Sequence, residues 1–356
     1  MAAGLISNLA AICIKHREGM VVLMDTAGKA KKFLKSKTFT LLCILVLIML
    51  FFWYFSPNHS FLKVRNITAI LNSMVLFILF SIGVSLLVIF GEFDLSPGYI
   101  GTAAGATMAA LLDGTGIPWY IVIVICLLLG IVFGLINAVL VNKFRVQSFI
   151  ATLAVGSFIA KGFSYIVSSG RTIAIDHPAI DWIAGFKLWD IIPVTVIVSV
   201  ALIIIYGIVL AKTQFGRSIY LSGGNKEAAR LAGLEPGKLS YILFANSGML
   251  GALAGALCAI RMKAGDINSG TNSYSFPAVT AVIFGGISFG GGSGNMLGCF
   301  LGLLIINAFN NGLTIMRVSP NWQGVASGAL LLLALTIDYF SNRGTRKPGR
   351  LKAARV

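Results

Sequence analysis

Residues Ile67 to Phe90 read ITAILNSMVLFILFSIGVSLLVIF, and no charged residue interrupts these 24 positions. A helix needs about 20 predominantly apolar residues to cross the hydrocarbon core of a bilayer. The run is therefore long enough to span a membrane, and it predicts a transmembrane helix. Charged residues are costly at the bilayer centre, and here they lie outside the run, at Arg65 and Glu92.

Other apolar runs lie on both sides of this one. Together they predict spans at 38–56, 67–90, 97–112, 118–141, 148–168, 190–211, 240–260, 276–291, 295–313 and 322–340. The third and eighth runs are short and rich in glycine, which indicates tilted, broken or re-entrant helices rather than simple spans. The predicted fold class is all-α: a polytopic membrane helix bundle of about ten transmembrane segments with short broken or re-entrant helices.

The composition agrees with a membrane protein. The 356 residues are 57% hydrophobic and only 11% charged, whereas a soluble domain is about 25% charged. Of the five cysteines, four lie inside apolar runs and none forms a CxxC pair. The cysteines are therefore interpreted as small hydrophobic residues, neither a disulfide framework nor a metal site.

Basic residues predict that both termini face the cytoplasm. In that orientation the inside segments carry 20 Lys and Arg residues and the outside loops carry seven. The predicted divisions are a basic cytoplasmic segment at 1–37, a transmembrane domain at 38–340 and a basic cytoplasmic tail at 341–356. The net charge of +16 is thus interpreted as membrane-anchoring charge, and no nucleic-acid binding is expected because no basic segment belongs to a soluble fold.

The longest predicted cytoplasmic loop, residues 212–239, contains the signals of a short helix. Asn225 can cap its start, and residues 226–234 include good helix formers. Gly233 is a natural stop, and Pro236 prevents continuation. A helix outside the membrane is interpreted as a contact site for another protein, with an ordinary surface helix as the alternative.

This loop also carries a resemblance. Glu227-Ala228-Ala229, followed after three residues by Gly233, resembles the EAA---G coupling motif of ABC importer permeases. Further stretches, in the same order along the chain, resemble motifs of the ribose-type branch of that family: Thr213–Arg217, Gly223–Asn225, Gly91–Gly98 (GEFDLSPG), Ser148–Leu153 (SFIATL), Ser169–Ile173 (SGRTI) and Asn310–Leu313 (NNGL). Tyr274 is followed by Ser275, Phe276 and Pro277, where that branch usually carries acidic residues, so the resemblance leaves the substrate open.

The resemblance implies the permease subunit of an ATP-driven ABC importer in a bacterial inner membrane. Such a subunit forms the translocation path for a small polar substrate, most often a monosaccharide such as ribose; relatives carry nucleosides or other small solutes. The implied partners are a cytoplasmic ABC ATPase that binds ATP, a second permease copy or a paralogue, an extracytoplasmic substrate-binding protein and membrane lipid.

No catalytic residue, cofactor or metal site is expected in the chain itself. The P-loop pattern G-x-x-x-x-G-K-[ST] does not occur, and the three histidines are dispersed without metal-ligand spacing. The alternative from another class is an ion-coupled secondary transporter, which would need paired intramembrane acids. Apart from Glu92 and Asp94, the spans supply almost none.

Two sets of candidate site residues follow. For coupling to the ATPase the resemblance points to Gly224, Asn225, Glu227, Ala228, Ala229, Arg230 and Gly233. For the translocation path, polar residues placed where polarity is costly are the candidates: Asp94, Ser96, Asn246, Asn307 and Asn310. The alternatives are a solvated turn residue for Asp94 and helix–helix hydrogen bonds for the asparagines.

Overall fold

The structure is a computed structural model that describes residues 37–189, 191–265, 271–319, 321–326, 328–330, 332 and 336. The predicted terminal segments, apart from Lys37, and nine of the 19 residues of the predicted span 322–340 lie outside the described residues. The helices are α2 Lys37–Phe55, η1 Pro57–Leu62, α3 Val64–Phe90, α4 Pro97–Gly114, α5 Trp119–Asn142, α6 Ser148–Ala154, η2 Val155–Ala160, α7 Lys161–Ser168, α8 Pro178–Gly185, α9 Val194–Lys212, α10 Gln214–Gly224, α11 Lys226–Leu231, α12 Pro236–Met262, α13 Thr271–Phe284 and α14 Met296–Ile315. Two short antiparallel ribbons pair β1 Ile173–Ala174 with β4 Ala264–Gly265, and β2 Lys187–Leu188 with β3 Ile192–Pro193.

The predicted all-α membrane bundle is confirmed, and the count of about ten spans is not. Within the described residues, seven helical segments are long and apolar enough to cross a membrane. They are α2, α3, α5, the continuous α6–η2–α7 segment, α9, α12 and α14. The two runs predicted to be short or broken correspond to α4 and α13, which are not among these seven.

The boundaries of the eighth predicted span were wrong. Helix α13 covers 271–284 rather than 276–291, and a non-helical turn follows it. Gly286 and Gly291 in that turn have φ of +87° and +78°, a left-handed conformation that glycine adopts without steric penalty. The glycine-rich sequence that looked like part of a span therefore forms a turn between two helices.

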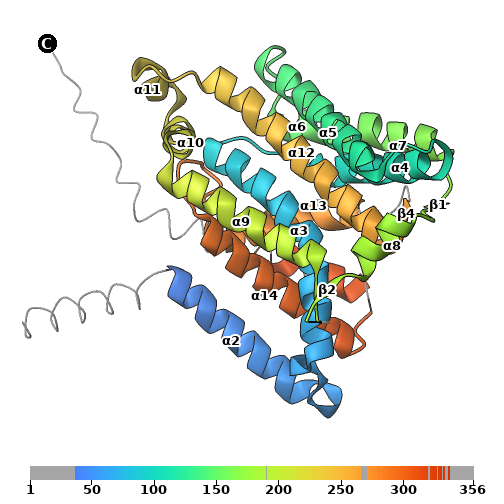
Figure 1. Cartoon of the computed structure of the whole chain (residues 1–356). Coiled ribbons are helices and arrows are strands. Elements are labelled where there is room, and N and C mark those ends of the chain that lie inside the picture. Colours follow the sequence, from blue (N-terminus) through green and yellow to red (C-terminus); the bar gives the residue numbers. More distant parts are fainter. Residues whose placement is uncertain are drawn as a thin grey trace, which may run out of the picture.

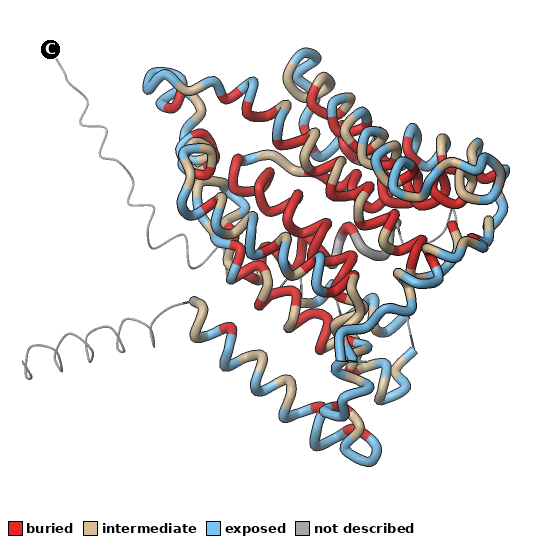
Figure 2. The backbone as a smooth tube through the Cα atoms, viewed as in Figure 1, coloured by how far each residue is buried: buried red, intermediate tan, exposed pale blue. Residues whose placement is uncertain are grey.

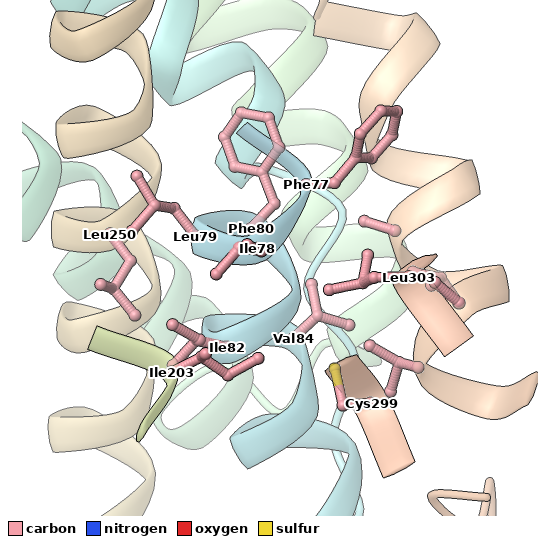
Figure 3. Close-up of a cluster of buried hydrophobic side chains, with 14 of the residues drawn as sticks. Phe77, Ile78, Leu79, Phe80, Ile82, Val84, Ile203, Leu250, Cys299 and Leu303 are labelled. Atoms are coloured by element: carbon pink, nitrogen blue, oxygen red, sulfur yellow. The ribbon is translucent and has the colours of Figure 1, made fainter. Parts of the chain in front are cut away.

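Helix α3 is the centre of the bundle. In its most apolar 18-residue stretch, 94% of the residues are buried, whereas the share is 11% in the corresponding stretch of α2 at the edge of the bundle (Figure 2). Around α3 pack α9, α12, α13 and α14. Figure 3 shows α3 side chains from Phe77 to Val84 among Ile203, Leu250 and Leu303 of the surrounding helices. The exposed apolar faces of α2 and α9 are those that a bilayer, rather than water, can cover.

Helix α12 approaches its neighbours α4 and α5 closely because the contact positions are glycines. A Cβ atom on Gly248 would overlap the carbonyl oxygen of Gly130 in α5, and one on Gly255 would overlap that of Gly101 in α4. Small residues at such positions let helix backbones pack together in a membrane. The short helix α4 is thus held against one of the longest helices of the bundle.

The bundle has two distinct ends (Figure 1). Helices α10 and α11 lie at one end, and α8 with the β1–β4 ribbon lies at the other. An ion pair between Lys263 Nζ and Asp181 Oδ1, 2.5 Å long, joins the end of α12 to α8. We refer to these as the α11 end and the α8 end.

Candidate functional site

The short helix predicted in the loop is present as α11. The Asn225 side-chain oxygen accepts hydrogen bonds from the backbone N–H groups of Glu227 and Ala228, both 3.0 Å long. Gly233 follows the helix with φ of +82°, and Pro236 begins α12. Local capping therefore sets both limits of the helix, as the sequence indicated.

The exposed face of α11 is polar at its start and apolar at its end. Glu227 and Arg230 form an ion pair of 3.0 Å on this face. Ala228 beside them is exposed, and Leu231 is 91% exposed. Sequence reasoning missed Leu231, although a leucine in the exposed turn of a loop helix was the available signal. Among the described residues, nothing covers this leucine side chain.

Ala229 does not share that face. Its side chain is buried against the protein itself, so its small size serves packing of α11 rather than direct approach by another surface. Gly224, at the end of α10, and the cap residue Asn225 are exposed. The candidate coupling residues are therefore divided between an outward face and the contact of α11 with the bundle.

The sequence did not predict α10. Thr213 caps it by accepting a hydrogen bond of 3.2 Å from the N–H of Gly216. The Tyr220 hydroxyl donates to the Gly294 carbonyl oxygen at 2.7 Å, which ties α10 to the turn between α13 and α14. Burial raises the pKa of Tyr220, so this hydroxyl keeps its proton and remains a donor. This hydrogen bond thus connects the loop to the helix bundle.

The helical structure is interrupted between α3 and α4 at residues 91–96, and Asp94 lies in this helix break. Asp94 is fully buried, which rules out the solvated-turn interpretation. Its Oδ1 accepts hydrogen bonds from the backbone N–H and the hydroxyl of Ser96, at 2.8 and 2.6 Å. Asn137 of α5 donates its Nδ2–H to Ser96 Oγ at 2.8 Å. Asp94 and Ser96, predicted as a pair, are brought together with Asn137.

Two hydrogen bonds from backbone N–H groups to side-chain hydroxyl oxygens connect the same break to α6. The N–H of Phe93 donates to Ser148 Oγ at 3.0 Å, and the N–H of Leu95 donates to Thr152 Oγ1 at 3.1 Å. Sequence reasoning assigned no role to Asn137, Ser148 or Thr152, although the last two lie in the SFIATL stretch. Buried backbone groups need such partners, since an unpaired one costs about as much as a lost hydrogen bond.

The remaining path candidates lie apart from Asp94. Asn246 of α12 accepts a hydrogen bond from the Tyr206 hydroxyl of α9. Asn307 of α14 donates to the Leu303 carbonyl at 3.0 Å and accepts from Ser73 Oγ of α3 at 3.2 Å. Asn310, one turn further along α14, is half-buried. Asn246 and Asn307 therefore each join two helices, α12 with α9 and α14 with α3, and these contacts do not converge on a single site.

A pocket of 440 Å³ opens at the α8 end, where the sequence predicted no site. Its polar lining comes from Asn72, Ser73, Lys187, Thr195 and Arg261. Arg261 is held in place by a hydrogen bond from Nη1 to the Asn72 carbonyl oxygen, 2.7 Å long. Thr195 Oγ1 is buried and has no hydrogen-bond partner among the described residues. The pocket is within the usual size range of small-molecule sites.

A multi-helix bundle with apolar outer faces, a helix break that buries Asp94 and a capped helix outside the spans defines the class: a polytopic membrane protein. The family model described as branched-chain amino acid transport system / permease component matches residues 66–335. The chain therefore belongs to this family of transport permeases, which confirms the resemblance found in its motifs.

Similar proteins include sugar permeases. The ribose import permease protein RbsC of Haemophilus influenzae is 32% identical over 319 residues, covering 88% of this chain and 95% of the relative. The L-arabinose transport system permease protein AraH of Escherichia coli is 31% identical over 264 residues, covering 72% and 77%. The xylose transport system permease protein XylH of Haemophilus influenzae is 29% identical, covering 84% and 95%. No solved structure matches the chain.

Proposed function

We propose that this chain is the permease subunit of an ATP-driven ABC importer and forms the translocation path for a monosaccharide. The observation that carries the proposal is the similarity to ribose, arabinose and xylose permeases over most of their length. The permease family supports a transport role without catalysis by this chain. ATP would be bound and hydrolysed by a separate cytoplasmic subunit.

The partners follow from this role. A cytoplasmic ABC ATPase docks on the outward face of α11, where Glu227, Arg230 and Leu231 are exposed. An extracytoplasmic binding protein delivers the sugar at the α8 end, and a second permease copy or a paralogue completes the path. The location is a bacterial inner membrane, with both termini and residues 212–239 on the cytoplasmic side. Alternating access then moves the helices between two arrangements.

Uptake by reconstituted vesicles tests this function. The chain, its ATPase and its binding protein are placed in vesicles, and accumulation of radiolabelled ribose, arabinose and xylose is measured. ATP-dependent accumulation of one of these sugars is expected, and a non-hydrolysable ATP analogue should abolish it. Accumulation driven by an ion gradient without ATP would instead support a secondary transporter. The absence of uptake of all three sugars would refute the monosaccharide assignment.

A further inference from the structure

Two helix breaks meet beneath the loop that carries α11. Gly91 ends α3 with φ of +86°, and the glycine-rich turn 285–295 follows α13. The N–H of Gly292 in that turn donates to the Ile89 carbonyl oxygen at 2.7 Å. Gly223 of α10 lies against both: a Cβ atom there would overlap the Ile89 oxygen and stand 2.8 Å from Gly292 N. The three backbones therefore touch directly, with no side chain between them.

An ion pair connects α11 itself to the first break. Lys226, the first residue of α11, places its Nζ on the carboxylate of Glu92, two residues before Asp94. The same ammonium group lies 5.0 Å from the ring centroid of Phe90, the last residue of α3. Glu92 is only 15% exposed, so solvent screens this pair less than one on the open surface. A charge-assisted bond with a cation–π contact fixes α11 to the break.

The other ion pairs at this end do not connect different elements. Glu227 with Arg230, and Glu235 with Lys238, are three residues apart, and all four side chains are more than half exposed. Pairs of this kind stabilise a helix only slightly. Among the described ion pairs at the α11 end, Lys226–Glu92 alone joins segments distant in the sequence.

We infer that the Lys226–Glu92 pair, with the Gly223 contact beneath it, makes the 91–96 break move as one body with α11. The inference rests on the proposed importer function and names its internal force-transmitting contact. Lys226 and Glu92 are positioning residues, since neither lies on the exposed docking face. Displacement of α11 reaches Asp94 through the chain and from there reaches α5 through Ser96 and Asn137. It reaches α6 through the hydrogen bond from the N–H of Phe93 to Ser148.

Charge reversal tests the contact. Glu92→Lys and Lys226→Glu are each expected to lower the amount of sugar imported per ATP hydrolysed about fivefold or more, the lower limit typical of coupled sites. The double variant Glu92→Lys/Lys226→Glu restores the attraction and should recover most of this ratio. Reversing Glu235 and Lys238 is the matched control and should leave the ratio unchanged. ATPase association, followed by pull-down, should persist in every variant.

A crosslink tests the claim of a rigid link. Glu92→Cys/Lys226→Cys, with Cys13 and Cys43 replaced by serine, is treated with a short bismethanethiosulfonate reagent. Because the two residues move together, the crosslinked protein should transport at a rate close to that of the uncrosslinked wild type. Loss of uptake on crosslinking, reversed by reductant, would overturn the inference, as would normal coupling in both single variants. Wild-type vesicles without ATP-dependent uptake would instead refute the proposed function, so the two failures are distinguishable.

Discussion

At the scale of single residues, Asp94 is a fully buried carboxylate at a helix break. A carboxylate buried inside a membrane protein must be hydrogen-bonded or paired, because its desolvation is expensive. Here Ser96 supplies two hydrogen bonds to one carboxylate oxygen, and Asn137 extends the network to α5. The Asp94 side chain thus stabilises the non-helical segment 91–96, which lacks the continuous backbone hydrogen bonds of a helix.

Replacing Asp94 tests this role. Asp94→Ala is expected to destabilise the fold by roughly 1–3 kcal/mol, since the Ser96 groups lose their buried acceptor. Sugar uptake should fall while the ATPase still associates. Thermal unfolding in detergent and vesicle uptake provide the measurements. Asp113→Ala, at the exposed far end of α4, the helix that follows the break, is the control. Unchanged uptake and unfolding in Asp94→Ala would reduce Asp94 to a dispensable turn residue.

Arg261 offers a second test at this scale. Its guanidinium lines the pocket at the α8 end and is held by the Asn72 carbonyl. Arg261→Lys keeps the charge but loses the planar set of donors, whereas Arg261→Gln loses the charge. If the pocket receives the sugar, both variants should raise the concentration needed for half-maximal uptake about tenfold. This change corresponds to about 1.4 kcal/mol, close to the lower end of what a hydrogen bond to a charged group contributes. Lys63→Gln, an exposed change outside the pocket lining, is the control, and an equal effect there would argue against the pocket.

At the scale of elements, α11 is short, well capped and exposed along one face. Six residues form too short a helix to be stable alone, so its shape depends on Asn225, Gly233 and burial of Ala229. These contacts fix the orientation of the exposed face of α11. The preceding part of the loop is attached to the bundle through α10. These properties suit a contact that transmits force to another subunit.

Substitutions that add bulk or change charge on α11 and at its end should weaken ATPase docking. Gly233→Trp strains a residue at φ of +82° and adds volume beside the docking face. Leu231→Asp removes the exposed apolar side chain, and Glu227→Lys reverses the charge at the helix start. Each variant should reduce pull-down of the ATPase or uncouple hydrolysis from uptake, with membrane insertion unchanged. Lys238→Gln, a nearby exposed change, is the control. If all three variants still bind the ATPase and still couple hydrolysis to uptake, the loop is only a linker between two helices.

At the scale of the whole molecule, the distribution of basic residues predicts orientation. The α11 end should face the cytoplasm, because 20 Lys and Arg residues lie on that side in the predicted topology and seven on the other. Reporter fusions at Val356 and near Asp181 should therefore report opposite sides of the membrane. A fusion at the C-terminus that reports an extracytoplasmic position would overturn this topology, and with it the docking of α11 on a cytoplasmic ATPase.

Much of this protein could be predicted from local sequence. The length of apolar runs determined the membrane-spanning helices, because each helix satisfies its backbone hydrogen bonds internally and needs only enough apolar residues. The loop helix was also local, since its cap Asn225 and its stop Gly233 act within one or two turns. The α10 helix was missed, since its two terminal glycines and its polar residues gave no clear periodic signal.

Only the tertiary structure decided how these elements meet. A helix that is apolar on every side does not reveal which face packs against which neighbour, so the contacts of α3 and α12 could not be predicted. Asn137 lies 41 residues from Ser96, and Lys226 lies 134 residues from Glu92. Nothing in either local stretch specifies such a partner. Packing brings the two helix breaks and the loop together because glycines permit backbone contact there, and that convergence links α11 to Asp94.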